Sequence, residues 1–62
     1  MNIRLEIIGK GGKHTNSVRE IEDKNFFKTK NTMDFAFKSG FCKWSGVYNA
    51  DTNELLYSVG KR

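Results

Sequence analysis

The sequence predicts a small α+β domain, in which an antiparallel sheet with the element order β-β-α-β-β carries one helix on one face. Three observations lead to this prediction. Apolar and charged residues alternate near the start of the chain, a glycine closes a stretch with helical spacing, and two strand-like runs, 41–48 and 54–59, flank an Asn- and Asp-rich turn. The 62 residues are expected to form a single domain, 1–62, because a chain this short builds only one core.

The first strand is predicted from a period of two. Ile3, Leu5 and Ile7 alternate with charged residues, which is typical of a strand with one buried face. Three glycines within residues 9–12 then end the strand, because glycine favours turns and loops. A return strand over residues 15–21 is the simplest way to pair the edge of the first one.

The segment 25–39 fits two patterns. Met33, Phe35 and Phe37 alternate as in a strand, whereas helical spacing relates a second set: Thr29, Met33, Ala36, Phe37 and Gly40. Gly40 suits a helix C-cap, Lys38 suits the last turn, and Asn31 or Thr32 followed by Asp34 suits an N-terminal turn. We therefore predict a helix over 27–39, with an all-β small barrel as the alternative fold.

The remaining residues predict a hairpin. In its first strand, Cys42, Trp44 and Tyr48 are expected on one side, and Phe41 and Val47 on the other. Residues 49–53 form the turn, and 55–57 belong to the return strand. A sheet covered on one face leaves the other face and its edges for binding.

Composition and charge narrow the function classes. Eleven Lys and Arg against seven Asp and Glu give a net charge of +4, which favours nucleic acid or an acidic protein surface as partner. With Cys42 as the only Cys and His14 as the only His, the chain can form neither an internal disulfide nor a Cys/His zinc site. A free thiol in so small a domain indicates the cytoplasm, and residues 1–8 read as a strand and not as a signal peptide or membrane span.

No motif predicts catalysis, a metal or a cofactor. Residues 9–15 are rich in Gly and Lys, but Gly12-Lys13 is followed by His14 where a phosphate-binding Walker loop needs Ser or Thr. His14 is interpreted as a solvated loop histidine and Cys42 as a buried small apolar residue. The Asp and Asn side chains of 51–54 lack the spacing of a calcium loop. We therefore expect a protein that is not an enzyme.

Basic residues interleaved with aromatic ones, at 24–30 and 38–44, give the strongest signal for nucleic-acid contact. Phe26, Trp44 and Tyr48 are the rings expected to be exposed. The predicted partner-binding or nucleic-acid-binding residues are Lys10, Lys13, His14, Lys24, Phe26, Lys28, Lys30, Lys43, Trp44 and Tyr48.

The order of elements resembles that of small bacteriophage host-takeover proteins, among them anti-CRISPR proteins. The resemblance is carried by Lys38-Ser39-Gly40, by the aromatic strand 44–48 and by the closing hairpin 51–57, about half of the chain, and it transfers no functional residue. It implies a non-enzymatic inhibitor that binds a host nucleic-acid-handling complex in the host cytoplasm.

Two other functions stay open. The first is direct nucleic-acid binding by a small basic protein. The second, ranked lowest, is a ribonuclease-type toxin that uses His14. The chain is expected to be a monomer or a homodimer joined through an edge strand.

Overall fold

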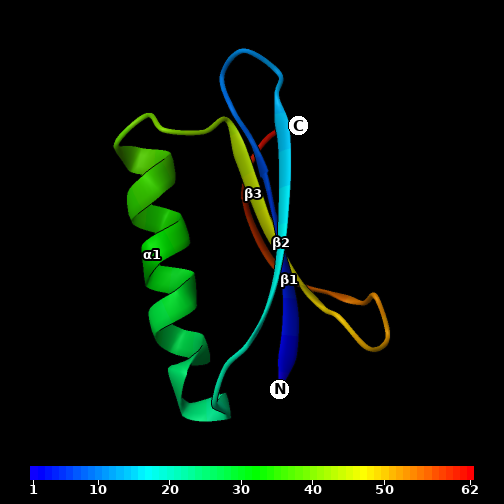
Figure 1. Cartoon of the computed structure of the whole chain (residues 1–62). Coiled ribbons are helices and arrows are strands. Elements are labelled where there is room, and N and C mark those ends of the chain that lie inside the picture. The colour runs from blue at the N-terminus through cyan, green and yellow to red at the C-terminus, as the bar shows by residue number, and fades with distance from the viewer.

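The computed structural model describes residues 1–62 and confirms the α+β fold (Figure 1). The elements, in order, are β1 (Asn2–Ile8), β2 (His14–Glu20), the 3₁₀ turn η1 (Asp23–Asn25), α1 (Phe26–Lys38), β3 (Trp44–Asn49) and β4 (Leu55–Gly60). The four strands form one sheet in the order β2-β1-β3-β4, and every neighbouring pair is antiparallel. The predicted return strand and the closing hairpin are both present.

The core lies between α1 and the centre of the sheet. Ile3, Met33 and Val47 are its buried members. Half-buried side chains surround them: Leu5, Ile21, Phe26, Leu56, Tyr57 and Val59. Leu5 of β1 is opposite Val47 of β3, so these two side chains fall on the face that α1 covers, whereas Ile8 and Trp44, also opposite each other, fall on the other face.

α1 confirms the predicted helix and overturns the all-β alternative. It begins at Phe26, directly after η1, so placing the N-terminal turn at Asn31 or Thr32 was wrong. Its end matches the prediction: Gly40 has a φ of +83°, and its N–H donates to Phe37 O (3.1 Å) while the N–H of the next residue donates to Ala36 O (3.0 Å). This pair of bonds is the Schellman arrangement, in which a left-handed glycine satisfies the last carbonyls of a helix.

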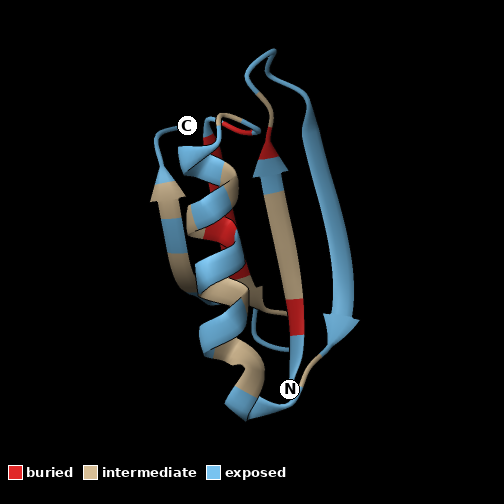
Figure 2. Cartoon of the chain, turned by 90° about the vertical axis from the view of Figure 1, so that its left-hand side faces the viewer, coloured by how far each residue is buried: buried red, intermediate tan, exposed pale blue.

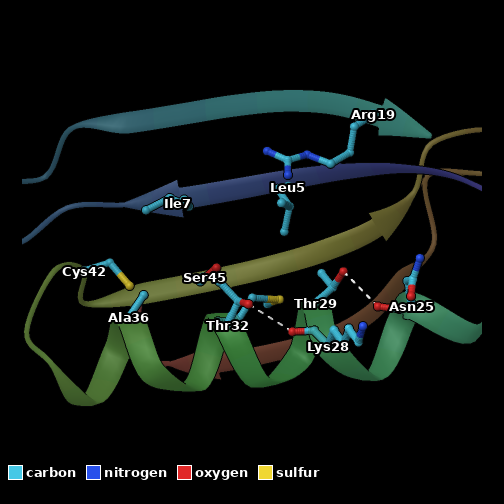
Figure 3. A pocket seen from close by; sticks show the side chains of 11 residues that line it. Leu5, Ile7, Arg19, Asn25, Lys28, Thr29, Thr32, Ala36, Cys42 and Ser45 are labelled. Carbon is cyan, nitrogen blue, oxygen red and sulfur yellow. Dashed lines mark hydrogen bonds between the residues drawn. The ribbon is translucent and has the colours of Figure 1, made fainter. Parts of the chain in front are cut away.

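α1 covers only half of the sheet, since it packs against β3 and β4. All seven residues of β2 are exposed, as Figure 2 shows along the whole strand. Between α1 and β1 lies a groove of about 230 Å³ with Leu5 and Ile7 on the sheet side and Met33 and Ala36 on the helix side (Figure 3).

The C-terminal hairpin differs from its prediction at one boundary. β3 begins at Trp44, and residues 41–43 belong to the connection from α1. In the turn, the Asn49 side chain accepts hydrogen bonds from the N–H of Asp51 (2.9 Å) and Thr52 (3.3 Å), and Asn53 takes a φ of 63°. Asn and Asp are the residues that best tolerate such a turn. Neither helical segment has the length and apolar character needed to cross a bilayer.

Candidate functional site

Five of the eight lysines and five of the seven acidic residues lie at opposite ends of the molecule, which measures 30 × 19 × 15 Å. Successive elements run in opposite directions, so the β1–β2 loop, the end of α1 and the C-terminus gather at one end (Figure 1). We call this the basic end, and define it by Lys10, Lys13, Lys38, Lys43 and Lys61. The acidic end, formed by η1, the end of β2 and the β3–β4 turn, holds Glu20, Glu22, Asp23, Asp51 and Glu54.

An open hollow of about 600 Å³ lies in the basic end and is lined by Lys10, Phe37, Cys42, Lys43, Gly60 and Lys61. Backbone bonds hold its rim together, because Lys43 N–H donates to Ile8 O (2.9 Å) and Lys61 N–H donates to Lys43 O (3.0 Å). No acidic residue lines the hollow.

The ammonium groups of the basic end are free of ion pairs. The cations that form ion pairs are the amino group of Met1, Lys24 and Arg62, and none of them belongs to the basic end as defined. Three unpaired ammonium groups around one hollow attract an anion, because no carboxylate in the chain has already neutralised them.

The exposed aromatic rings are not the predicted ones. Trp44 is buried, with 5% of its surface accessible, and Phe26 and Tyr48 are half-buried. The most exposed rings are those of Phe27, Phe35 and Phe41, at 66%, 68% and 72%. Phe41 follows Gly40 at the basic end, and Phe37, which lines the hollow, is 38% exposed.

Trp44 is buried on the open face of the sheet, the face opposite α1. Its indole lies against Gly46, where an added Cβ would be 2.7 Å from Cζ2. The guanidinium of Arg62 lies over the indole, with Cζ 4.1 Å from the ring centroid. The glycine below and the arginine above leave the ring no free surface for a base.

Arg4 is held at the other end of the open face. Its guanidinium donates to Asn16 Oδ1 (2.9 Å) and Asn53 Oδ1 (2.7 Å), and it lies 4.0 Å from the centroid of the Tyr48 ring. These contacts join β1 to β2 and to the β3–β4 turn. They use both the positive charge and the ring within the chain.

Glu6 is the anion at the centre of the open face. Its carboxylate lies 3.5 Å from His14 Nδ1 and 3.6 Å from Arg62, and it accepts a hydrogen bond from Tyr48 Oη (3.2 Å). His14 is the first residue of β2 and lies beside a carboxylate, which corrects its placement in the loop, while its side chain is 58% exposed and so is solvated as predicted. On the open face, Glu6 therefore pairs with Arg62, while Arg4 is held by two neutral amide oxygens and the Tyr48 ring.

The structure brings together only three of the predicted lysines, Lys10, Lys13 and Lys43. Lys24 lies at the acidic end and pairs with Glu22 at 3.2 Å. Lys28 lines the groove, and Lys30 lies 5.5, 6.0 and 5.6 Å from the ring centroids of Phe26, Phe27 and Tyr57.

Sequence reasoning missed Lys38, Lys61, Phe37 and Phe41 as members of the basic end. The signal was available in the alternating direction of the elements. In a β-β-α-β-β order, the first loop, the helix end and the C-terminus meet at one end of the sheet.

Two further groups bear on chemistry. Tyr57 Oη donates to Asp34 Oδ1 at 2.6 Å, and this hydrogen bond, with a smaller contribution from desolvation, raises the pKa of Tyr57 above its usual 10.0. Cys42 is buried at 2% accessibility, which confirms its interpretation as a small apolar residue.

The basic end is therefore the strongest candidate site, and what it offers is cation charge beside aromatic surface. No group of three or more His, Cys, Asp or Glu side chains lies close enough together to hold a metal ion. Compared with protein-family models, curated proteins and solved structures, the chain matches none of them.

Proposed function

We propose that the protein is a non-enzymatic binding protein that attaches to single-stranded nucleic acid through its basic end. The observation that carries the proposal is the hollow in which Lys10, Lys43 and Lys61, all free of ion pairs, surround the partly exposed ring of Phe37. Ammonium groups bind backbone phosphates, and a nearby ring gives an unstacked base a surface to stack on.

A single strand fits this site better than a duplex does. The bases of a duplex are stacked inside it, whereas a single strand can turn a base into the hollow toward Phe37 or onto Phe41. Five of the seven acidic residues lie at the far end of the molecule, so the electrostatic field of the chain orients its basic end toward a polyanion as the two approach. The free thiol of Cys42 suits the reducing environment of the cytoplasm, where we place the activity.

Fluorescence anisotropy with labelled single-stranded RNA, single-stranded DNA and duplex DNA tests the proposal. Three lysine–phosphate contacts on a single strand predict a slope of about −2 in a plot of log affinity against log salt. The triple variant Lys10→Gln/Lys43→Gln/Lys61→Gln should lose roughly fiftyfold in affinity at about 0.15 M salt, and most of that slope. Absence of binding even at low salt would reject the proposal.

A matched variant separates the site from net charge. Lys24→Gln/Lys28→Gln/Lys30→Gln removes the same charge from outside the basic end and should change the affinity less than about threefold. Equal losses in both triple variants would show that the basic end is not the site. Phe41→Ala should weaken binding by roughly five- to a hundredfold if a base stacks on this ring.

The second candidate is a phage or mobile-element inhibitor that occupies a surface of a host nucleic-acid-handling complex. Phe27 and Phe35 of α1 favour it, because they are exposed by about two-thirds and exposed aromatic rings commonly anchor protein interfaces. An inhibitor would retain one host complex from a lysate, lose it in Phe27→Ser/Phe35→Ser, and keep it in the lysine triple variant.

A further inference from the structure

The outer edge of β2 is an unpaired strand edge. β2 is the first strand of the sheet order, and all seven of its residues are exposed. The bonds Gly9 N–H to Lys13 O and Ile21 N–H to Met1 O, both 2.9 Å, show that the odd-numbered residues of β2 bond to β1. Because bonded and non-bonded positions alternate in an antiparallel ladder, the backbone N–H and C=O groups of its even-numbered residues point outward.

The opposite edge of the sheet, β4, is less suited to pairing. Its ladder with β3 shifts register between Val47 and Tyr48, and Gly60 ends the strand with a φ of +91°. Bulges and interruptions of this kind protect edges from further pairing. The ladder of β2 has no register shift, and residues 14–20 contain neither proline, glycine nor lysine.

We propose that two copies of the chain pair through β2, antiparallel and centred on Ser17. A two-fold axis through this residue places His14 opposite Glu20 of the second copy and Asn16 opposite Val18 of the second copy. These even-numbered residues carry the outward backbone groups, so the two edges can exchange a complete set of ladder hydrogen bonds. The imidazole and the carboxylate that meet at each end of the pairing can form a hydrogen bond or an ion pair.

The charge distribution favours the same orientation. An antiparallel pairing sets the basic end of each copy beside the acidic end of the other. Lys13, one residue before β2, lies opposite Ile21 of the second copy and near Glu20 and Glu22 of the second copy. Complementary charge at both ends of the interface steers association and fixes its register.

The paired sheet leaves the hollow free. Lys43, Gly60 and Lys61 lie at the β3 and β4 side of the molecule, away from the paired edge. Lys10, which also lines the hollow, comes from the β1–β2 loop beside the paired edge, so dimerisation and nucleic-acid binding are measured separately.

Sedimentation equilibrium over a concentration series from about 10 μM to about 1 mM tests the pairing. The 7.1 kDa chain should approach 14.2 kDa (2 × 7.1 kDa) as concentration rises. Val18→Pro removes an outward N–H without breaking a bond to β1 and should leave a monomer. Ser58→Pro makes the matched change on the outer edge of β4. Tyr57 and Val59 occupy the positions that are hydrogen-bonded to β3, so the N–H of Ser58 points outward, and its loss should leave the dimer intact.

A graded series at position 20 tests the register without proline. Glu20 forms no ion pair in the monomer, so Glu20→Gln and Glu20→Lys should keep the fold, as circular dichroism will show. The dimer dissociation constant should rise about threefold for Glu20→Gln and about tenfold for Glu20→Lys, since the interface contains the pair twice. Glu54→Lys changes the net charge equally but lies in the β3–β4 turn, and should leave the dissociation constant within about twofold of wild type.

A monomer throughout the concentration series would overturn the pairing. So would a dimer that survives Val18→Pro and is lost in Ser58→Pro. Equal effects of Glu20→Lys and Glu54→Lys would overturn the register.

Discussion

The open sheet face and the basic end both place cations beside aromatic rings, yet only one of them is free to bind. On the open face, Arg4 and Arg62 already contact Tyr48 and Trp44, Glu6 forms an ion pair with Arg62, and two Asn side chains hold Arg4. At the basic end the lysines form no ion pair, and Phe37 and Phe41 keep accessible surface. Composition alone does not distinguish the two regions; the position of the carboxylates does.

The difference has a simple origin in the chain. Glu6 is the one acidic residue in β1, and the register places it where residues from three other segments reach it. The loops that form the basic end contain no acidic residue over 9–13, 39–43 or 60–62. The polar and charged groups of the open face contact one another and so stabilise the fold, whereas the unpaired lysines of the basic end remain available to a partner.

The largest effect is expected from Gly46→Ala, which tests whether the open face is structural. The new methyl group would occupy the space of the Trp44 indole, so the ring must leave its site between Gly46 and Arg62. We expect the free energy of unfolding to fall by about 1–3 kcal/mol, measured by urea denaturation followed by tryptophan fluorescence.

Gly11→Ala is the matched control for this change. Gly11 has no atom within 4 Å of an added Cβ, and its φ is not in the left-handed region. Its stability should equal or slightly exceed that of wild type. If Gly46→Ala leaves the free energy of unfolding unchanged, the indole is mobile, and the open face becomes a candidate binding surface again.

A smaller effect is expected from Glu6→Gln, which uncouples the open face electrostatically. The side chain of Glu6 is 15% exposed, while its partners His14 and Arg62 are 58% and 56% exposed. Because solvent screens these partners, the loss in unfolding free energy should be only about 1 kcal/mol. Oligonucleotide affinity should stay within about twofold of wild type; a large gain would mean that Glu6 restrains cations that take part in binding.

The smallest effect concerns Tyr57, whose hydroxyl is engaged with Asp34 on the covered side of the sheet. Ionisation of Tyr57 breaks that hydrogen bond, so its pKa is raised in the folded state. The stabilisation is complete below pH 10.0 and is lost as pH rises through the folded pKa. Asp34→Asn should lower the pKa of Tyr57 toward 10.0, as measured by ultraviolet absorbance of the tyrosinate.

Tyr48→Phe supplies the background for this titration, because Tyr57 is then the only tyrosine in the chain. An unchanged titration in Asp34→Asn would mean that the contact is absent in solution. The Asp34 carboxylate would then be free to weaken the field of the neighbouring lysines.

The sequence was sufficient for the elements of the fold. The alternation of Ile3, Leu5 and Ile7 identified β1, and Gly40 separated the helix from the strand alternative, because a left-handed C′ residue has no role in a continuous strand. The helix predicted over 27–39 starts one residue from the observed Phe26, but the N-terminal turn expected at Asn31 or Thr32 was wrong, because the helix begins without a side-chain cap at Asn25. A sequence pattern predicts the end of a helix only where a capping residue marks that end.

The candidate site was predicted only in part, because it depends on contacts between distant residues. Trp44 was expected to be exposed, but Gly46 opens a space beside it on the same face, and Arg62 covers it from the C-terminus. Lys61 reaches the basic end only because β4 runs back toward Lys43. These placements follow from strand order and register, which single-residue patterns do not encode.

Because Cys42 is buried, the reactivity of its thiol reports how often the end of α1 separates from the sheet. Cys42 lies in the connection between the end of α1 and the start of β3 and is 2% accessible, so a labelling reagent reaches its thiol faster when that junction separates. The rate of modification would therefore measure how often the helix end lifts from the sheet. A nucleic acid held in the adjacent hollow should slow that rate, so the rate of thiol modification would report the fraction of the 62-residue chain that has ligand bound.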